Sequence, residues 1–134
     1  MRYLPAIAIL FLATPPLSAQ TKTWDGKYET GNIEVTFVYF VPSDRTPLPD
    51  WRERVDYYRR RIELFHAREF QGQSTLTTVV HPEPLVSQAS TAELRRGDAD
   101  AIFFRTLGES DRRLDFGKGE RKAFPILLAL SEIN

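Results

Sequence analysis

Alternating apolar positions mark the first clear element of the chain. Across residues 33–41, one face at period two is entirely apolar, while the other face begins with Glu34 and ends with Phe40. This pattern, rich in β-branched and aromatic residues, predicts a strand that starts half exposed and ends covered on both sides. Pro42 has no amide hydrogen to give to a strand ladder, so we expect the strand to end there.

A helix with one apolar stripe follows this strand. Asp50 and Glu53 have the spacing of a capping box at its start. Apolar residues then recur at helical spacing, which predicts a single buried face. These residues are Trp51, Val55, Tyr58, Ile62 and Phe65. We expect the helix to end near Phe70, shortly before Gly72.

Shorter elements come next. Residues 74–80 have the composition of a second strand, and the order strand, helix, strand predicts a parallel crossover. Pro82 and Pro84 predict an extended loop. Ser90 with Glu93 predicts a second capping box and a helical turn or two.

Two apolar segments complete the predicted core. After Asp98, the helical spacing across residues 99–107 favours a helix over a short buried strand, with Gly108 as its expected end. Residues 123–130 are continuously apolar, which predicts a central strand buried on both faces. Together these elements predict an α/β fold with a small mixed or parallel sheet and a strand-helix-strand crossover.

The first 19 residues have the layout of a secretory signal peptide. Arg2 gives a positive start, residues 4–13 are apolar, and Ala19 precedes the expected cleavage site. The apolar run is shorter than the roughly 20 residues that a membrane-spanning helix needs. We therefore expect export to the periplasm or the extracellular space and no stable membrane anchor, with residues 20–134 as a single α/β domain.

The charge balance and the absence of cysteine limit the classes of partner and the kinds of cross-link that we expect. Without residues 1–19, which contain only one charged residue, the chain carries 17 basic and 18 acidic residues. This balance gives no global electrostatic reason to bind nucleic acid or an anionic membrane. The chain has no cysteine, so no disulfide stabilises the exported product.

The turn after the first strand holds the best candidate binding residues. Ser43, Asp44 and Arg45 follow the carboxyl end of that strand, where open α/β sheets bind ligands. In a binding site, Asp44 would act as an acid or ligand and Arg45 as an anion clamp. The favoured alternative is turn chemistry, in which Ser43 and Asp44 hydrogen-bond to nearby backbone.

Histidine offers one further candidate. His81 follows the second strand and joins the binding candidates, whereas His66 is expected on the surface of the helix. The two histidines are not in metal-ligand spacing, and no HExxH motif, nucleophile elbow or phosphate loop is present. We therefore assign no catalytic and no metal-ligating residue, and a small hydrolase that uses Asp44 and His81 is the weakest of three hypotheses.

One stretch resembles a known family. The segment VTFVYFVPSDRTPLPDWRERVDYYRRRIELFHAREF resembles the start of exported bacterial metalloprotease-like domains of the zincin type, and AFPILLALSEIN is similar to a later buried strand of that family. The resemblance covers residues 33–70 well and 124–134 loosely. It implies a partial zincin-like domain, in which zinc is bound by an HExxH helix further along the chain. That helix is absent from this sequence, so no metal ligand is carried over.

The resemblance gives the leading functional hypothesis. The chain is expected to be the amino-terminal, non-catalytic portion of an exported metalloprotease-like protein, truncated before the catalytic half, with no cofactor of its own and zinc only in a missing carboxyl-terminal half. The alternative is an exported ligand-binding or interaction module with a protein or peptide partner. Absence of the second half predicts exposed apolar surface on residues 124–130, through which the chain could self-associate.

Overall fold

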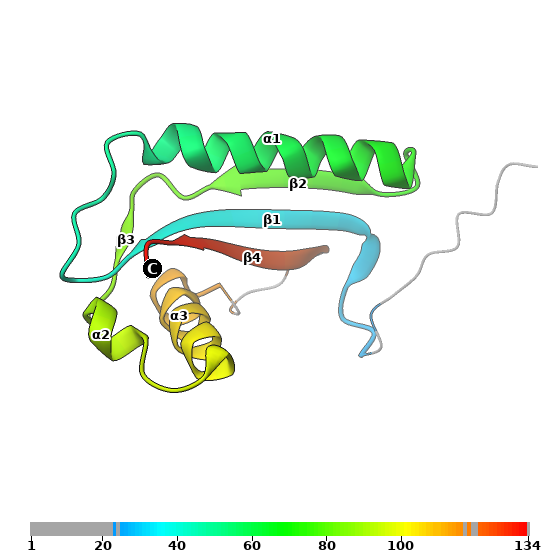
Figure 1. Cartoon of the computed structure of the whole chain (residues 1–134). Helices are drawn as coiled ribbons and strands as arrows, with labels where there is room; N and C mark the ends of the chain where they lie inside the picture. Colours follow the sequence, from blue (N-terminus) through cyan, green and yellow to red (C-terminus); the bar gives the residue numbers. More distant parts are fainter. Residues whose placement is uncertain (1–22, 24, 117, 119–120, 134) are drawn as a thin grey trace, which may run out of the picture.

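The protein is a three-layer α/β unit. The computed structural model describes residues 23, 25–116, 118 and 121–133. In chain order the elements are β1 (Glu29–Val41), α1 (Trp51–Phe70), β2 (Thr75–Val80), β3 (Leu85–Val86), α2 (Thr91–Leu94), α3 (Ala99–Leu114) and β4 (Ala123–Ser131). Figure 1 shows the sheet between α1 on one face and α3 on the other. The predicted α/β class is confirmed, with a small open sheet of four parallel strands.

The central strand of this sheet is β1. It pairs with β2 over Asn32–Phe37 and with β3 over Phe40–Val41, and both partners are parallel. On the other edge it pairs with β4, also parallel, from Ile33 to Phe40. The short β3, which lies inside the predicted extended loop, therefore continues the same edge as β2. Pro42 ends β1 as predicted, whereas its start lies four residues earlier than the apolar alternation indicated.

The strand predicted over residues 123–130 is confirmed, but its predicted central position and its predicted burial on both faces are wrong. The strand exists, but in the described part of the chain β4 pairs only with β1. Its residues are half-buried, and Ile126 is 36% exposed. A continuous apolar run is equally compatible with a central strand and with an edge strand whose flanks are only partly covered.

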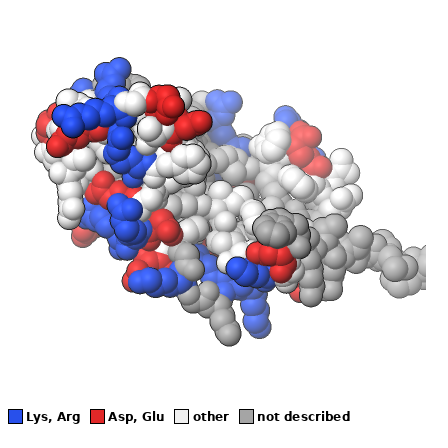
Figure 2. Space-filling view, turned by 90° about the horizontal axis from the view of Figure 1, so that it is seen from below, with Lys and Arg blue, Asp and Glu red and all other residues white. Residues whose placement is uncertain are grey.

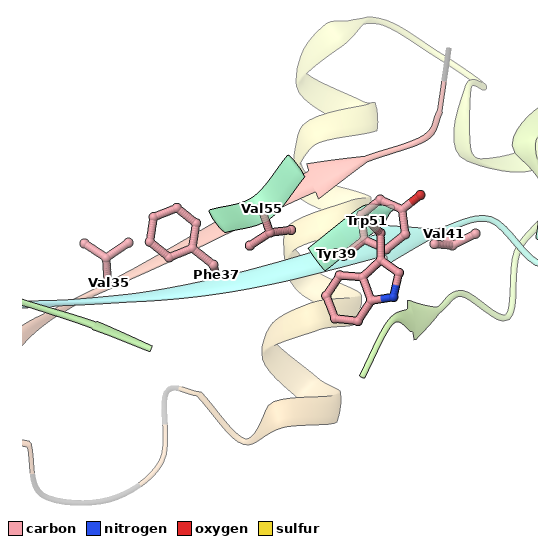
Figure 3. Packing of buried hydrophobic residues seen from close by; sticks show 6 residues of the cluster. All are labelled: Val35, Phe37, Tyr39, Val41, Trp51 and Val55. Atoms are coloured by element: carbon pink, nitrogen blue, oxygen red, sulfur yellow. The ribbon is translucent and has the colours of Figure 1, made fainter. Parts of the chain in front are cut away.

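One hydrophobic cluster joins α1 to the sheet. Odd-numbered residues of β1 point toward α1 and meet Trp51 and Val55, which are buried (Figure 3). The Tyr39 and Trp51 rings stack with their centroids 5.4 Å apart and an interplanar angle of 7°. Leu128 and Leu130 of β4 pack against the same cluster. The first half of the predicted stripe is therefore confirmed.

The second half of that stripe differs from the prediction. Phe65 is 55% exposed and Tyr58 is 50% exposed, while His66 is buried. His66 lies four residues after the partly buried Ile62, stacks on Phe70, and places Nε2 2.7 Å from the Ser74 hydroxyl. The expectation of a surface histidine was wrong because the buried face of the helix drifts toward β2.

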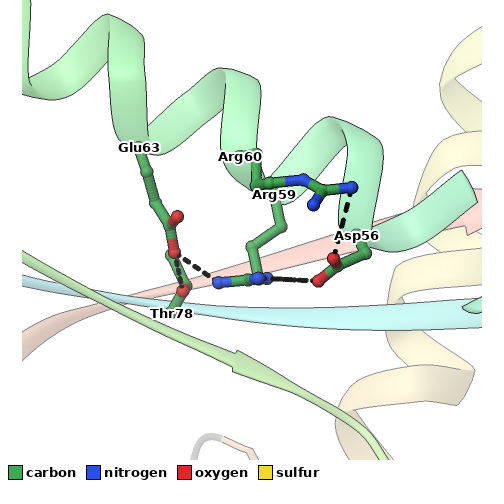
Figure 4. A network of polar contacts seen from close by, with 5 residues as sticks. All are labelled: Asp56, Arg59, Arg60, Glu63 and Thr78. Atoms are coloured by element: carbon green, nitrogen blue, oxygen red, sulfur yellow. Dashed lines mark hydrogen bonds and ion pairs between the residues drawn. The ribbon is translucent and has the colours of Figure 1, made fainter. Parts of the chain in front are cut away.

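A polar network also holds α1 against β2. Arg59 donates to Glu63 at 2.8 Å and forms an ion pair with Asp56 at 2.7 Å, and Arg60 lies 3.5 Å from the other Asp56 oxygen (Figure 4). The Thr78 hydroxyl on β2 donates to Glu63. The network thus extends from the outer surface of the helix to the sheet. It favours one rotation of α1 about its own axis relative to β2.

The second cluster lies under the other face of the sheet. Even-numbered β1 residues, Val38 and Phe40, pack with Leu85 and Leu94, and Leu114 and Leu127 contact this cluster. The helix α3 runs through Gly108, where an end was predicted, to Leu114. A helical glycine costs about 1 kcal/mol relative to alanine, and burial of Thr106, Ser110 and part of Leu114 offsets that cost.

The helix starts follow the sequence in two of three cases. The capping box of Ser90 and Glu93 is present, and the Asp98 side chain accepts from the Ala101 amide. Asp50 makes no side-chain cap bond and instead accepts from Arg54 at 2.9 Å.

The predicted signal peptide, residues 1–19, lies outside the described residues. No helix in the described part of the chain combines the length and apolar character needed to cross a bilayer.

Candidate functional site

The loop after β1 is hydrogen-bonded to the segment that begins α2. The Asp44 carboxylate accepts hydrogen bonds from the Thr91 backbone N–H at 2.7 Å and from the Thr91 hydroxyl at 2.8 Å. The Ser43 amide donates to the Ala89 carbonyl at 3.0 Å, and the Arg45 amide donates to the Pro42 carbonyl at 3.1 Å. The bonds from Thr91 hold the pKa of Asp44 below its ordinary value. The loop therefore positions the start of α2.

His81 lies in a different place from this loop. Its amide donates to the Phe37 carbonyl at 2.8 Å, and its Nδ1 lies 2.8 Å from the Glu83 carbonyl oxygen. Phe37 precedes Ser43 by six residues, which is roughly 20 Å of extended chain. The sheet therefore separates His81 from Asp44 along β1, so the geometry gives no support to a hydrolytic pair of these residues.

One concave surface lies between α1 and β4. This α1 groove has a floor of Tyr39, Leu128 and Leu130, a wall of Tyr57, Tyr58 and Ile62, and a volume of about 660 Å³. It exists because α1 packs mainly over β1 and β2, so the side chains of β4 on that face are only partly covered. Tyr57 and Tyr58 are each 50% exposed, and their rings meet edge to face.

One end of the α1 groove is acidic. Asp50, Glu53 and Glu132 contribute carboxylates there, against the single guanidinium of Arg54. Arg54 is paired with Asp50 at 2.9 Å, and no cation in the described part of the chain forms an ion pair with the other two carboxylates. Burial raises the pKa of the Tyr39 hydroxyl, and the Glu132 carboxylate adds to this shift. The groove is therefore apolar along its length and anionic at its end.

A second concave surface lies below the sheet. This α3 groove is lined by Ile102, Phe103 and Leu107 from α3 and by Leu127, Ala129 and Ile133 from the end of the chain, and its volume is about 590 Å³. Phe103 is 56% exposed. On the face seen in Figure 2, acidic and basic side chains are interspersed, and uncharged surface lies among them. The two grooves share Leu128 and Ser131 of β4 among their lining residues.

The sequence indicated part of this site. The expected absence of a second half predicted exposed apolar surface on β4, but the acidic end was not predicted, because Glu53 and Glu132 are far apart in sequence and line one groove only in the fold. The contact between His66 and Ser74 was also missed. Its signal is the spacing of His66 four residues after Ile62, which continues the buried face of the helix.

The described residues contain no group of three or more His, Asp or Glu side chains that could hold a metal ion. Comparison of the whole chain with protein-family models, with curated proteins and with solved structures finds no match.

Proposed function

We propose that this chain is the amino-terminal, non-catalytic portion of an exported metalloprotease-like protein, and that it serves as the sheet onto which a further segment docks. The observation that carries the proposal is the outer edge of β4. The strand from Ala123 to Leu130 has no polar residue, it pairs on one side only in the described part of the chain, and it lies between two grooves. Such an edge is a template for another strand.

The arrangement of the sheet also supports this proposal. The two stretches that resemble zincin-type domains, residues 33–70 and 124–134, are far apart in sequence. In the fold they are neighbours, because β1 pairs with β4 from Ile33 to Phe40. Elements of one inherited unit are expected to lie together in this way.

Under this proposal the chain contributes no reacting group. Its residues supply a parallel sheet and two covering helices, while zinc and the catalytic groups belong to the docking segment. Asp44 and His81 are occupied in local contacts, which agrees with a supporting role.

Two experiments test the proposal. Metal analysis of the purified exported protein after dialysis is expected to find no zinc, and one tightly bound zinc per chain would contradict the site assignment. The genomic sequence that follows the codon for Asn134, read in all frames, is expected to encode an HExxH motif. A downstream region without this motif would refute the metalloprotease-like origin.

The alternative function is an exported interaction module. The same apolar edge favours it, and it differs in that the docking segment comes from a separate chain. The downstream sequence distinguishes the two, because an interaction module requires no HExxH there.

A further inference from the structure

The two outer strands of the sheet differ in chemistry. The strand β2 exposes Thr75, Thr77 and Val79, while Leu76 and Val80 pack against the core beneath α1. This is the alternation of an edge strand that faces water on one side. The strand β4 has apolar residues on both faces and no charged residue from Ala123 to Ser131. Charged side chains are a usual protection of free edges, and β4 lacks them.

The hydrogen-bond pattern shows which backbone groups this edge presents. The Glu132 amide donates to the Phe40 carbonyl, so even-numbered residues of β4 direct their backbone groups toward β1. The odd-numbered residues Leu127, Ala129 and Ser131 therefore direct N–H and C=O outward. Pro125 is also odd-numbered, and its missing N–H falls on the outer edge, where proline is tolerated.

A strand added to this edge would lie beside both grooves. Its side chains would alternate between the α1 groove, with Tyr57, Tyr58 and Ile62, and the α3 groove, with Ile102 and Phe103. Both sets of neighbours are mainly apolar. The added strand should therefore be apolar on both faces.

Charge adds one more requirement. Glu53, in the first turn of α1, and Glu132, directly after β4, line the α1 groove at the carboxyl end of β4. A side chain on that face of an added strand would meet two carboxylates that form no ion pair with a described residue. A lysine or arginine fits that position.

We infer that the outer edge of β4 binds an extended polypeptide segment, antiparallel to β4, with apolar side chains on both faces and one basic side chain beside Glu53 and Glu132. Antiparallel pairing is favoured because it is slightly more stable per residue and is a common way to end a parallel sheet. In that direction the basic residue lies near the amino end of the segment. The main-chain bonds give affinity, and the two grooves give specificity.

In one register, pairing with a second copy of β4 leaves backbone carbonyls without donors. In a two-fold pairing centred on Leu127, Pro125 would face the partner's Ala129, whose carbonyl would then lack a donor. The loss would occur twice by symmetry. This inference rests on the proposed function only for the source of the segment, which under that function belongs to the same protein. The chemistry of the segment follows from the edge, the grooves and the charges.

The test uses a synthetic peptide, acetyl-Arg-Val-Leu-Val-Ile-Val-Thr-amide, labelled with a fluorophore, and the purified exported protein. Antiparallel alignment places its arginine opposite Glu132 and its valines over the α3 groove. We expect saturable binding by fluorescence anisotropy. Amide exchange should slow at Leu127, Ala129 and Ser131 and stay unchanged at Leu128 and Leu130, which already face β1. The reversed sequence is the control for direction and should bind more weakly.

Two variants sharpen the test. Ala129→Pro removes an outward donor without removing a bond to β1, and it should weaken peptide binding about 10-fold or more. Glu132→Gln should weaken binding about 3-fold, while Glu69→Gln at the far end of α1, an equal change of charge, should have no effect. Circular dichroism confirms that each variant is folded.

Three results would overturn the inference. They are the absence of saturable binding, protection of amides outside the outer edge of β4, and concentration-dependent protection of Leu127 and Ala129 without peptide, which would assign the edge to a second copy. None of these bears on the presence of a downstream HExxH motif. Failure of the docking inference is therefore distinguishable from failure of the proposed function.

Discussion

Docking of α1 on the sheet forms one wall of the α1 groove, and the substitution Val55→Ala tests it directly. Val55 has no exposed surface and lies in the cluster with Phe37 and Trp51. The substitution removes two methyl groups, which is about 1.6 kcal/mol of transfer free energy, and incomplete closure of the cavity raises the cost to about 2–3 kcal/mol. The better helix propensity of alanine returns about 0.5 kcal/mol. The net expected loss is therefore about 2 kcal/mol.

Urea unfolding followed by far-ultraviolet circular dichroism measures this loss. With a slope of about 2 kcal/mol per molar urea for a domain of this size, the midpoint should fall by about 1 M. Leu64→Ala is the matched control on the same helix, because Leu64 is 71% exposed and should change the stability by less than about 0.5 kcal/mol. Equal midpoint shifts in the two variants would refute the packing of α1 described here.

Three further predictions concern other parts of the chain. The pKa of Asp44 is lowered in the fold, so its bonds to Thr91 stabilise the protein above the ordinary pKa of 3.8 and are lost as the pH falls through the lowered value. The protection factor of the Thr91 amide, which compares its exchange with that of an unstructured peptide at the same pH, should fall in acid, and Asp44→Asn should remove that pH dependence; an unchanged protection factor would exclude the bonds between Asp44 and Thr91. His66→Ala should cost about 1–3 kcal/mol in urea unfolding, because the Ser74 hydroxyl loses its buried partner; a cost near zero would mean that the contact is not formed. If the chain is exported by signal cleavage, as proposed, amino-terminal sequencing of the mature protein should begin at Gln20, and an intact leader would contradict that proposal.

Hydrophobic periodicity predicted which segments form helices and strands better than it predicted how these elements pack. The bounds of α1 followed from its stripe and from the residues before Trp51, because local sequence decides where a long amphipathic helix forms. The end of α3 did not follow, because the helix continues through Gly108 to Leu114, which packs against residues distant in sequence. The two-residue β3 is too short for any periodic signal.

The candidate site was less predictable for the same reason. A binding role for Ser43, Asp44, Arg45 and His81 was an expectation from their positions at strand ends, and the fold shows local partners for Asp44 and His81. The grooves depend on how far α1 and α3 extend over β4, which is a property of tertiary packing. An apolar run identifies a buried strand, but only the pairing of strands shows which of its edges is free.

The central place of β1 also has a kinetic consequence. Ile33 pairs with Leu76 on one edge and with Phe124 on the other, so the second edge can form only by closing a much longer loop than the first. Contacts of such high sequence separation form slowly because a long loop must close first. During that interval the apolar side chains of β1 and the emerging β4 are both exposed, and aggregation competes with folding. Pairing of β4 with β1 is therefore the step that removes this exposed apolar surface.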